Sequence, residues 1–138
     1  MRVTGTRITG EPPSASDLEA MAMAAMARLP NAFKPHVEGV VVQIADFAED
    51  KVLRELGIEN LWELTGLYHG RPLDQQSIWD SGDMPPVVTL FRLPLLAEWM
   101  ESGGRLDALI FHVVVHEIGH HFGLSDDDMH ALEDGAGD

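Results

Sequence analysis

Two histidines and a glutamate in the last quarter of the chain are spaced so that they can share one metal ion. His116 and His120 are four residues apart, so on a helix their imidazoles lie on the same face, about one turn from each other. Glu117 follows the first histidine and can reach a water molecule at such an ion. The pattern H-E-x-x-H therefore predicts a zinc site, with Glu117 as the general base of a hydrolytic reaction.

A catalytic zinc needs a third protein ligand, and the residues after the second histidine predict one. Gly123 tolerates the left-handed conformation that ends a helix and reverses the chain, and Asp126 follows three residues later. We expect Asp126 to be the third ligand, which leaves the fourth position to water. The same residues also fit the acidic first turn of another helix, capped by Ser125. The alternative ligands, in decreasing order, are Asp128, His130 and Glu133.

Three more side chains compete for a role in this site. His112 lies one turn before His116 on the same face, and we expect it to be a buried imidazole with its hydrogen bonds satisfied. His121 points about 100° away from His120, where a contact with the negative end of the helix dipole accounts for it. Tyr68 is the only tyrosine; it could donate to a developing oxyanion, but a core position is the simpler expectation. None of the three is expected to be catalytic or metal-binding.

The H-E-x-x-H motif requires a rigid helix, and the sequence predicts such a helix together with strands that pack against it. Residues 106–122 are apolar on nearly every face, which is typical of a helix packed inside a domain. A first amphipathic helix begins at a capping box of Ser16 and Glu19 and stops at Pro30. Further segments are predicted from runs of β-branched and apolar residues and from turn residues: strands at 37–44, 61–70 and 87–91, a hairpin from the second of these towards 77–79, a short helix or a loop at 46–57, and a short helix at 95–100.

Length and composition set the class of protein. A chain of 138 residues with 45% hydrophobic and 23% charged residues is typical of one globular domain. We expect residues 1–13 to form a flexible arm and residues 14–138 the domain. The first residues lack the apolar core of a secretory signal, so a cytoplasmic location is expected.

Charge and cysteine content exclude other functions. The chain has no cysteine, so a zinc ion must be held by histidine and carboxylate ligands. The formal net charge of -14 argues against a nucleic-acid partner, and no apolar run is long enough to cross a membrane. The expected partner is a peptide or protein substrate, and the expected oligomeric state is a monomer or a weak oligomer.

The stretch from His116 to Asp126 resembles the H-E-x-x-H-x-x-G-x-x-H/D signature of metzincin peptidases, with aspartate in the third ligand position. However, only 18 residues follow His120, and Met129 is too close to form the Met-turn of that group. The chain instead resembles the minimal bacterial zincin-like metallopeptidase family, formerly a domain of unknown function. Residues 67–73 and 88–92 share in this likeness, which covers most of residues 29–133.

This resemblance implies a fold and a ligand set. The implied fold is a single compact α+β domain, with a small mixed sheet packed on the buried motif helix. The implied cofactor is Zn2+, bound by His116, His120 and Asp126. In zincins an edge strand above the helix pairs with an extended substrate, and by position the strand at 87–91 is the candidate for that edge.

The expected function is a zinc-dependent metallopeptidase in which Glu117 is the general base. A small domain leaves little room for a long cleft, so its specificity is expected to be narrow. The alternative is a non-catalytic, zinc-stabilised module that binds a partner or has a regulatory role. A third hypothesis, partner binding through the acidic surface, depends on charge alone.

Overall fold

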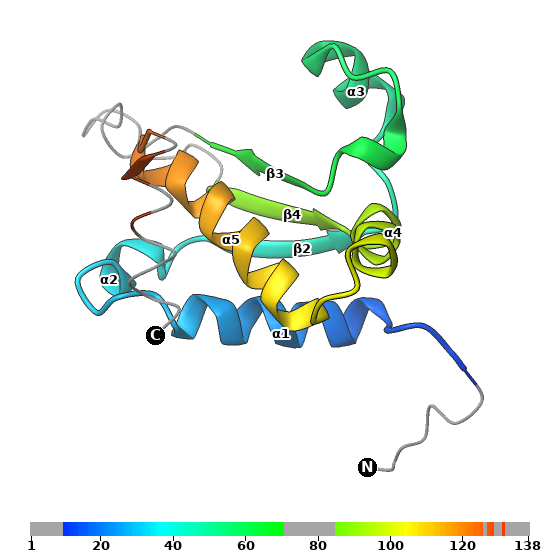
Figure 1. The fold of residues 1–138 in the computed structure, drawn as a ribbon. Coiled ribbons are helices and arrows are strands. Elements are labelled where there is room, and N and C mark those ends of the chain that lie inside the picture. Colours follow the sequence, from blue (N-terminus) through cyan, green and yellow to red (C-terminus); the bar gives the residue numbers. More distant parts are fainter. Residues whose placement is uncertain (1–9, 71–84, 126, 129–130, 132–138) are drawn as a thin grey trace.

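The fold is a small sheet with two long helices packed against one of its faces (Figure 1). The computed structural model describes residues 10–70, 85–125, 127–128 and 131. In chain order the elements are α1 (Ala15–Ala27), α2 (Lys34–Val37), β2 (Val41–Ala45), α3 (Asp50–Leu56), the 3₁₀ turn η2 (Leu61–Glu63), β3 (Gly66–His69), β4 (Val87–Phe91), α4 (Arg92–Ser102) and α5 (Leu106–Phe122). The predicted α+β class is confirmed.

The three strands form a mixed sheet in the order β2-β4-β3. β2 and β4 are parallel, with Val42 opposite Val88, whereas β3 is antiparallel to β4, with Tyr68 opposite Val88. The expectation that residues 87–91 form the edge is therefore wrong, because β4 has a neighbour on each side. Its central position pairs both edges of the strand, and its side chains alternate between partly buried and buried from Val87 to Leu90.

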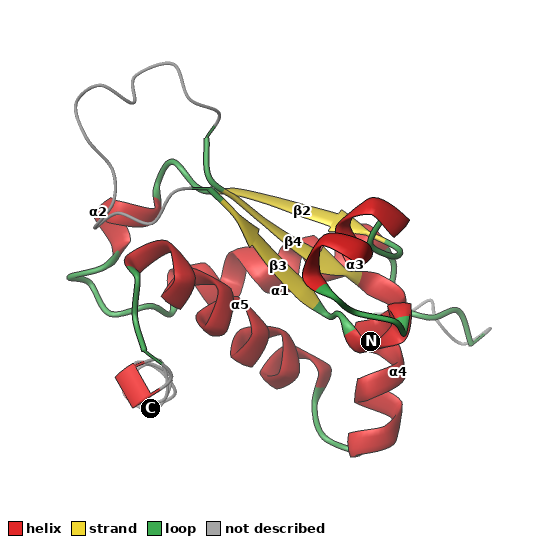
Figure 2. Ribbon diagram, turned by 90° about the horizontal axis from the view of Figure 1, so that it is seen from above, coloured by secondary structure: helices red, strands yellow, loops and turns green. Residues whose placement is uncertain are grey.

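The main core lies between the sheet and helices α1 and α5, which run below the sheet when it is seen from above (Figure 2). Alternation along β4 directs Val88 and Leu90 into this core. The helices contribute Leu18, Ala22, Ala25, Ile110, Val114 and Ile118, each at most 3% exposed. α5 lies along β3 and α1 along β2, so the motif helix is fixed between α1 and one edge of the sheet. In the part of the chain that the structure describes, no helix has the length and apolar character needed to cross a membrane.

The first helix and the second strand differ in detail from the prediction. The capping box is formed by Ser14 and Asp17, two residues before the expected pair of Ser16 and Glu19. The segment 61–70 is a strand only in its second half, since Asn60 caps η2 through a bond from the Trp62 N–H to its side chain. The predicted hairpin towards 77–79 lies outside the described residues.

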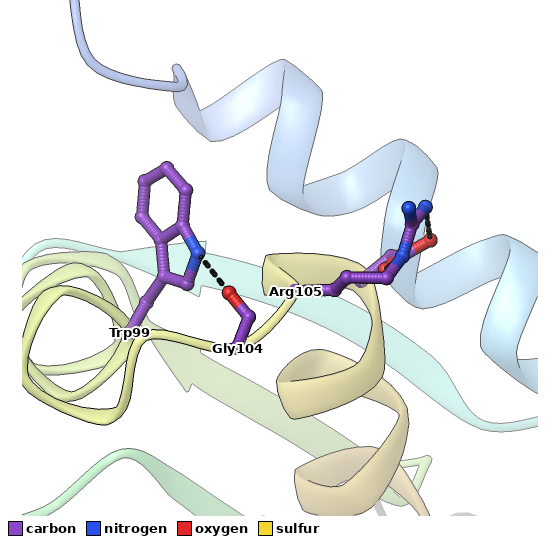
Figure 3. Close-up of polar contacts among 4 residues, drawn as sticks. Trp99, Gly104 and Arg105 are labelled. Atoms are coloured by element: carbon purple, nitrogen blue, oxygen red, sulfur yellow. Dashed lines mark hydrogen bonds and ion pairs between the residues drawn. The ribbon is translucent and has the colours of Figure 1, made fainter.

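The turn that starts the motif helix is held by side chains (Figure 3). The Trp99 indole N–H, on α4, donates to the Gly104 carbonyl oxygen over 2.9 Å. Arg105 then forms a two-point ion pair with Asp107, with both N to O distances 2.9 Å. Asp107 lies in the first turn of α5, where a negative charge is favourable. The predicted helix 106–122 is confirmed at both ends.

Candidate metal and catalytic site

Helix α5 carries a line of three histidines on its exposed face. His112, His116 and His120 follow one another at intervals of four residues, and all three are exposed. The ring centroids of His116 and His120 are 5.3 Å apart. The structure therefore places the two predicted ligands side by side. The expectation that His112 is buried is wrong, because it shares the exposed face of the ligand pair.

The neighbouring line of side chains on α5 lies beneath β3. Val113, Glu117 and His121 are each one residue further along than the exposed histidines, hence about 100° round the helix, and all three are buried. Gly66 makes the close approach possible: a Cβ there would lie 2.7 Å from Val113 Cγ1 and 3.3 Å from Glu117 Cγ. The predicted general base is thus held between helix and strand, directly beside the ligand pair.

Burial changes the acidity of Glu117. Its side chain is only 9% exposed, and the cost of burying a charge raises the pKa of this carboxyl to about 7. The backbone N–H of Tyr68 donates a hydrogen bond to the carboxyl, and this bond lowers the pKa of Glu117. Such a group can both release and hold a proton at neutral pH, as general acid-base catalysis requires.

The adjacent His121 is not at the surface but is buried and hydrogen-bonded on both sides. It is 2% exposed, with the Tyr68 hydroxyl 2.8 Å from Nδ1 and the His36 carbonyl oxygen 3.0 Å from Nε2. A carbonyl oxygen only accepts, so Nε2 carries the proton and Nδ1 accepts from the tyrosine. The predicted dipole contact does not describe this role. Sequence reasoning also missed that Tyr68 and His121 are partners, because 53 residues separate them.

The turn after the helix has the predicted form. Gly123 has φ 71°, and the N–H groups of Gly123 and Leu124 donate to the carbonyls of His120 and Gly119, which is the Schellman ending. Ser125 then accepts from the backbone N–H of Asp128 through its hydroxyl, over 3.2 Å, as a helix cap does.

The predicted third ligand, Asp126, lies outside the described residues, as do the alternatives His130 and Glu133. Asp128 is described and exposed. In the described part of the chain, no group of three histidine or acidic side chains is close enough to hold a metal ion. Two exposed imidazoles beside a buried carboxyl nevertheless fit a zinc ion that takes its third ligand from the segment after Gly123.

The comparisons with known proteins agree with this arrangement. A family model described as zincin-like metallopeptidase matches residues 37–136, which include the whole sheet and the motif helix. The chain belongs to the zincin-like metallopeptidase family. No curated protein matches it.

Proposed function

We propose that this protein is a zinc-dependent peptidase with a narrow range of substrates. His116 and His120 would hold the zinc ion together with Asp126, and Glu117 is the general base. The observation that carries the proposal is the pairing of two exposed imidazoles, one turn apart on α5, with a buried carboxyl one residue beyond the first of them. Membership of the zincin-like metallopeptidase family supports the same chemistry.

The roles in the reaction follow from these positions. Bound zinc would polarise the scissile carbonyl and make water a better nucleophile. Glu117 takes a proton from the attacking water and passes it to the leaving amine. β3 packs against this side chain, and the burial raises the pKa of its carboxyl above the ordinary value.

The substrate would bind along β3, which in the described sheet has a strand neighbour on one side only. Phe91 N–H bonds to the Thr65 carbonyl, so by antiparallel alternation the backbone groups of Gly66 and Tyr68 point away from β4. An extended peptide could pair with the backbone groups of Gly66 and with the Tyr68 carbonyl as an added strand, whereas the Tyr68 N–H is already bonded to Glu117. This assignment replaces β4, which has no open edge.

A catalytic role for zinc fits the structure better than a stabilising one. His116 and His120 are exposed, and neither belongs to the cluster of buried apolar residues that holds α5 on the sheet. A zinc ion that supports the fold is normally enclosed by four protein ligands. The packing around α5 involves apolar side chains instead, so we expect the domain to fold without a metal ion.

The test is the substitution Glu117→Gln in the zinc-loaded protein. The amide keeps the shape and can still accept from the Tyr68 N–H, but it cannot take a proton. We expect cleavage of a mixed peptide library, followed by mass spectrometry, to fall by about 10² to 10⁴-fold while one zinc remains bound. The matched control is Glu98→Gln, a carboxyl exchange on the outside of α4. Equal cleavage by the Glu117→Gln and wild-type proteins would refute the proposal.

A further inference from the structure

The buried residue His121 has no part in the chemistry assigned so far, although it lies one helical turn beyond Glu117 on the same face of α5. A polar ring that is 2% exposed is costly unless it is fully hydrogen-bonded, and both nitrogens have a partner here. Its position raises the question of what these bonds hold in place.

Tyr68 connects His121 to the general base. Its hydroxyl donates to His121 Nδ1, while its backbone N–H donates to the Glu117 carboxyl. One residue of β3 therefore contacts α5 at two points a turn apart. The Tyr68 and His121 rings also pack together, with centroids 5.6 Å apart. Fixing the side chain of Tyr68 thus fixes the backbone donor that holds Glu117.

The other side of His121 is fixed by a different part of the fold. Its Nε2–H donates to the His36 carbonyl oxygen, in α2, and the adjacent Phe122 ring packs edge-on against Phe33 with centroids 4.9 Å apart. The imidazole is therefore held between α2 and β3. It has one tautomer available in this setting, the one that accepts from Tyr68.

We propose that His121 is a positioning residue for Glu117, acting through Tyr68. This inference depends on the proposed function for its kinetic consequence but not for its structural one. The His121–Tyr68 bond sets the position of β3 along α5, and that position sets the direction of the Glu117 carboxyl. Because reaction rates are sensitive to small displacements of catalytic groups, losing this bond should lower kcat rather than raise KM.

The test uses the fact that Tyr68 is the only tyrosine. Protein labelled with 15N-tyrosine gives a single amide resonance, which reports directly on the N–H that contacts Glu117. Three variants are compared with the wild type. His121→Leu keeps an apolar side chain in the site but removes both hydrogen bonds, whereas His121→Asn retains an acceptor where Nδ1 was. Tyr68→Phe removes only the hydroxyl; because it contains no tyrosine, it is compared by kcat, and it serves in that measurement if the leucine variant does not fold.

In His121→Leu we expect the tyrosine resonance to move towards its position in Glu117→Ala, in which the Tyr68 N–H has lost its acceptor. We also expect kcat to fall on the order of tenfold, with KM and zinc stoichiometry unchanged. His121→Asn should recover most of both effects, and Tyr68→Phe should lower kcat like His121→Leu. His112→Asn, an exposed histidine on the same helix, is the control and should match the wild type.

An unmoved tyrosine resonance in His121→Leu would overturn the inference, as would equal loss in the leucine and asparagine variants or an effect on KM alone. Failure of the proposed function would look different. The wild-type protein would then cleave no peptide, while the tyrosine resonance would still show whether His121 controls the contact between Tyr68 and Glu117.

Discussion

The backbone N–H of Tyr68 donates a hydrogen bond to the carboxyl of Glu117, which joins an edge of the sheet to the motif helix. The contact combines two properties of the site. A strand edge presents unpaired donors, and a buried carboxyl needs a donor to be tolerated. The strand supplies the donor and the carboxyl supplies the acceptor. The pKa of Glu117 is still about 7, because burial raises it by more than this one hydrogen bond lowers it.

The raised pKa of Glu117 predicts how the stability of the metal-free protein depends on pH. The folded protein holds this proton up to about pH 7, whereas a glutamic acid in the unfolded chain releases it near its ordinary pKa of 4.5. The native state thus binds more protons in this window, so its free energy of unfolding falls as pH rises from 4.5 to 7. In Glu117→Gln the side chain does not titrate, so this fall in the free energy of unfolding is absent. We expect the variant to be more stable than the wild type at pH 8, by up to about 3 kcal/mol.

Urea unfolding of the two metal-free proteins at pH 4.5 and pH 8 measures this difference. The two curves should coincide at the lower pH. A stability gap of the same size at both values would show that burial does not raise the pKa of Glu117.

Gly66→Ala should damage the contact between β3 and α5. The new Cβ would lie 2.7 Å from Val113 Cγ1, and a valine side chain has little freedom to move away. We expect a loss of about 1 to 3 kcal/mol in unfolding free energy. Gly104→Ala is the matched control, since a Cβ there meets nothing within 4 Å. If both variants were equally stable, β3 would lie further from the helix than described.

Removing either ligand histidine should abolish tight zinc binding. His116→Ala and His120→Ala each leave one imidazole of the pair, and we expect affinity to fall by more than about 100-fold, because even indirect partners of a metal ligand contribute about 10- to 100-fold. His112→Ala changes the third histidine of the same exposed face and should bind zinc like the wild type. Competition with a fluorescent chelator gives the three affinities. Equal weakening in all three would contradict the assignment of the pair.

The third ligand can be identified by comparing two neighbouring aspartates. Asp126→Ala should weaken zinc binding as strongly as loss of a histidine, because a zinc ion with only two protein ligands is held poorly. Asp128→Ala should have little effect on affinity, since Asp126 takes the third ligand position of the H-E-x-x-H-x-x-G-x-x-D pattern and Asp128 lies two residues beyond it. The reverse order of effects would transfer the ligand role to Asp128.

Chelation should remove zinc without unfolding the domain. The core that holds α5 consists of apolar side chains, so helix content by circular dichroism should be unchanged after treatment with EDTA at about 25 °C. The thermal midpoint should fall only by the amount expected from losing the binding free energy of zinc. Complete unfolding on chelation would favour the stabilising zinc module instead.

Much of the site could be predicted because its spacing is local. The bounds of α5 follow from turn residues at both ends, and the distance between His116 and His120 follows from helix geometry. The left-handed turn at Gly123 was predictable for the same reason. These features depend on residues within a few positions of one another.

The remaining features depend on partners distant in the sequence. His112 and His121 are both histidines in an apolar helix, and no pattern within the helix tells which of them is buried. His121 is buried because Tyr68 and the His36 carbonyl supply its hydrogen bonds. Likewise, the apolar run at 87–91 predicts a strand but not its neighbours, so its central place in the sheet was not foreseen.

Helix α1 precedes the segment that matches the family, yet it fills one whole side of the motif helix. Leu18 and Ala22 are completely buried in the same core as Ile110, Val114 and Ile118. A fragment trimmed to residues 37–136 would therefore keep every zinc-binding candidate but lose the α1 side of the core against which α5 packs. The segment that identifies the family is thus shorter than the segment that forms the hydrophobic core.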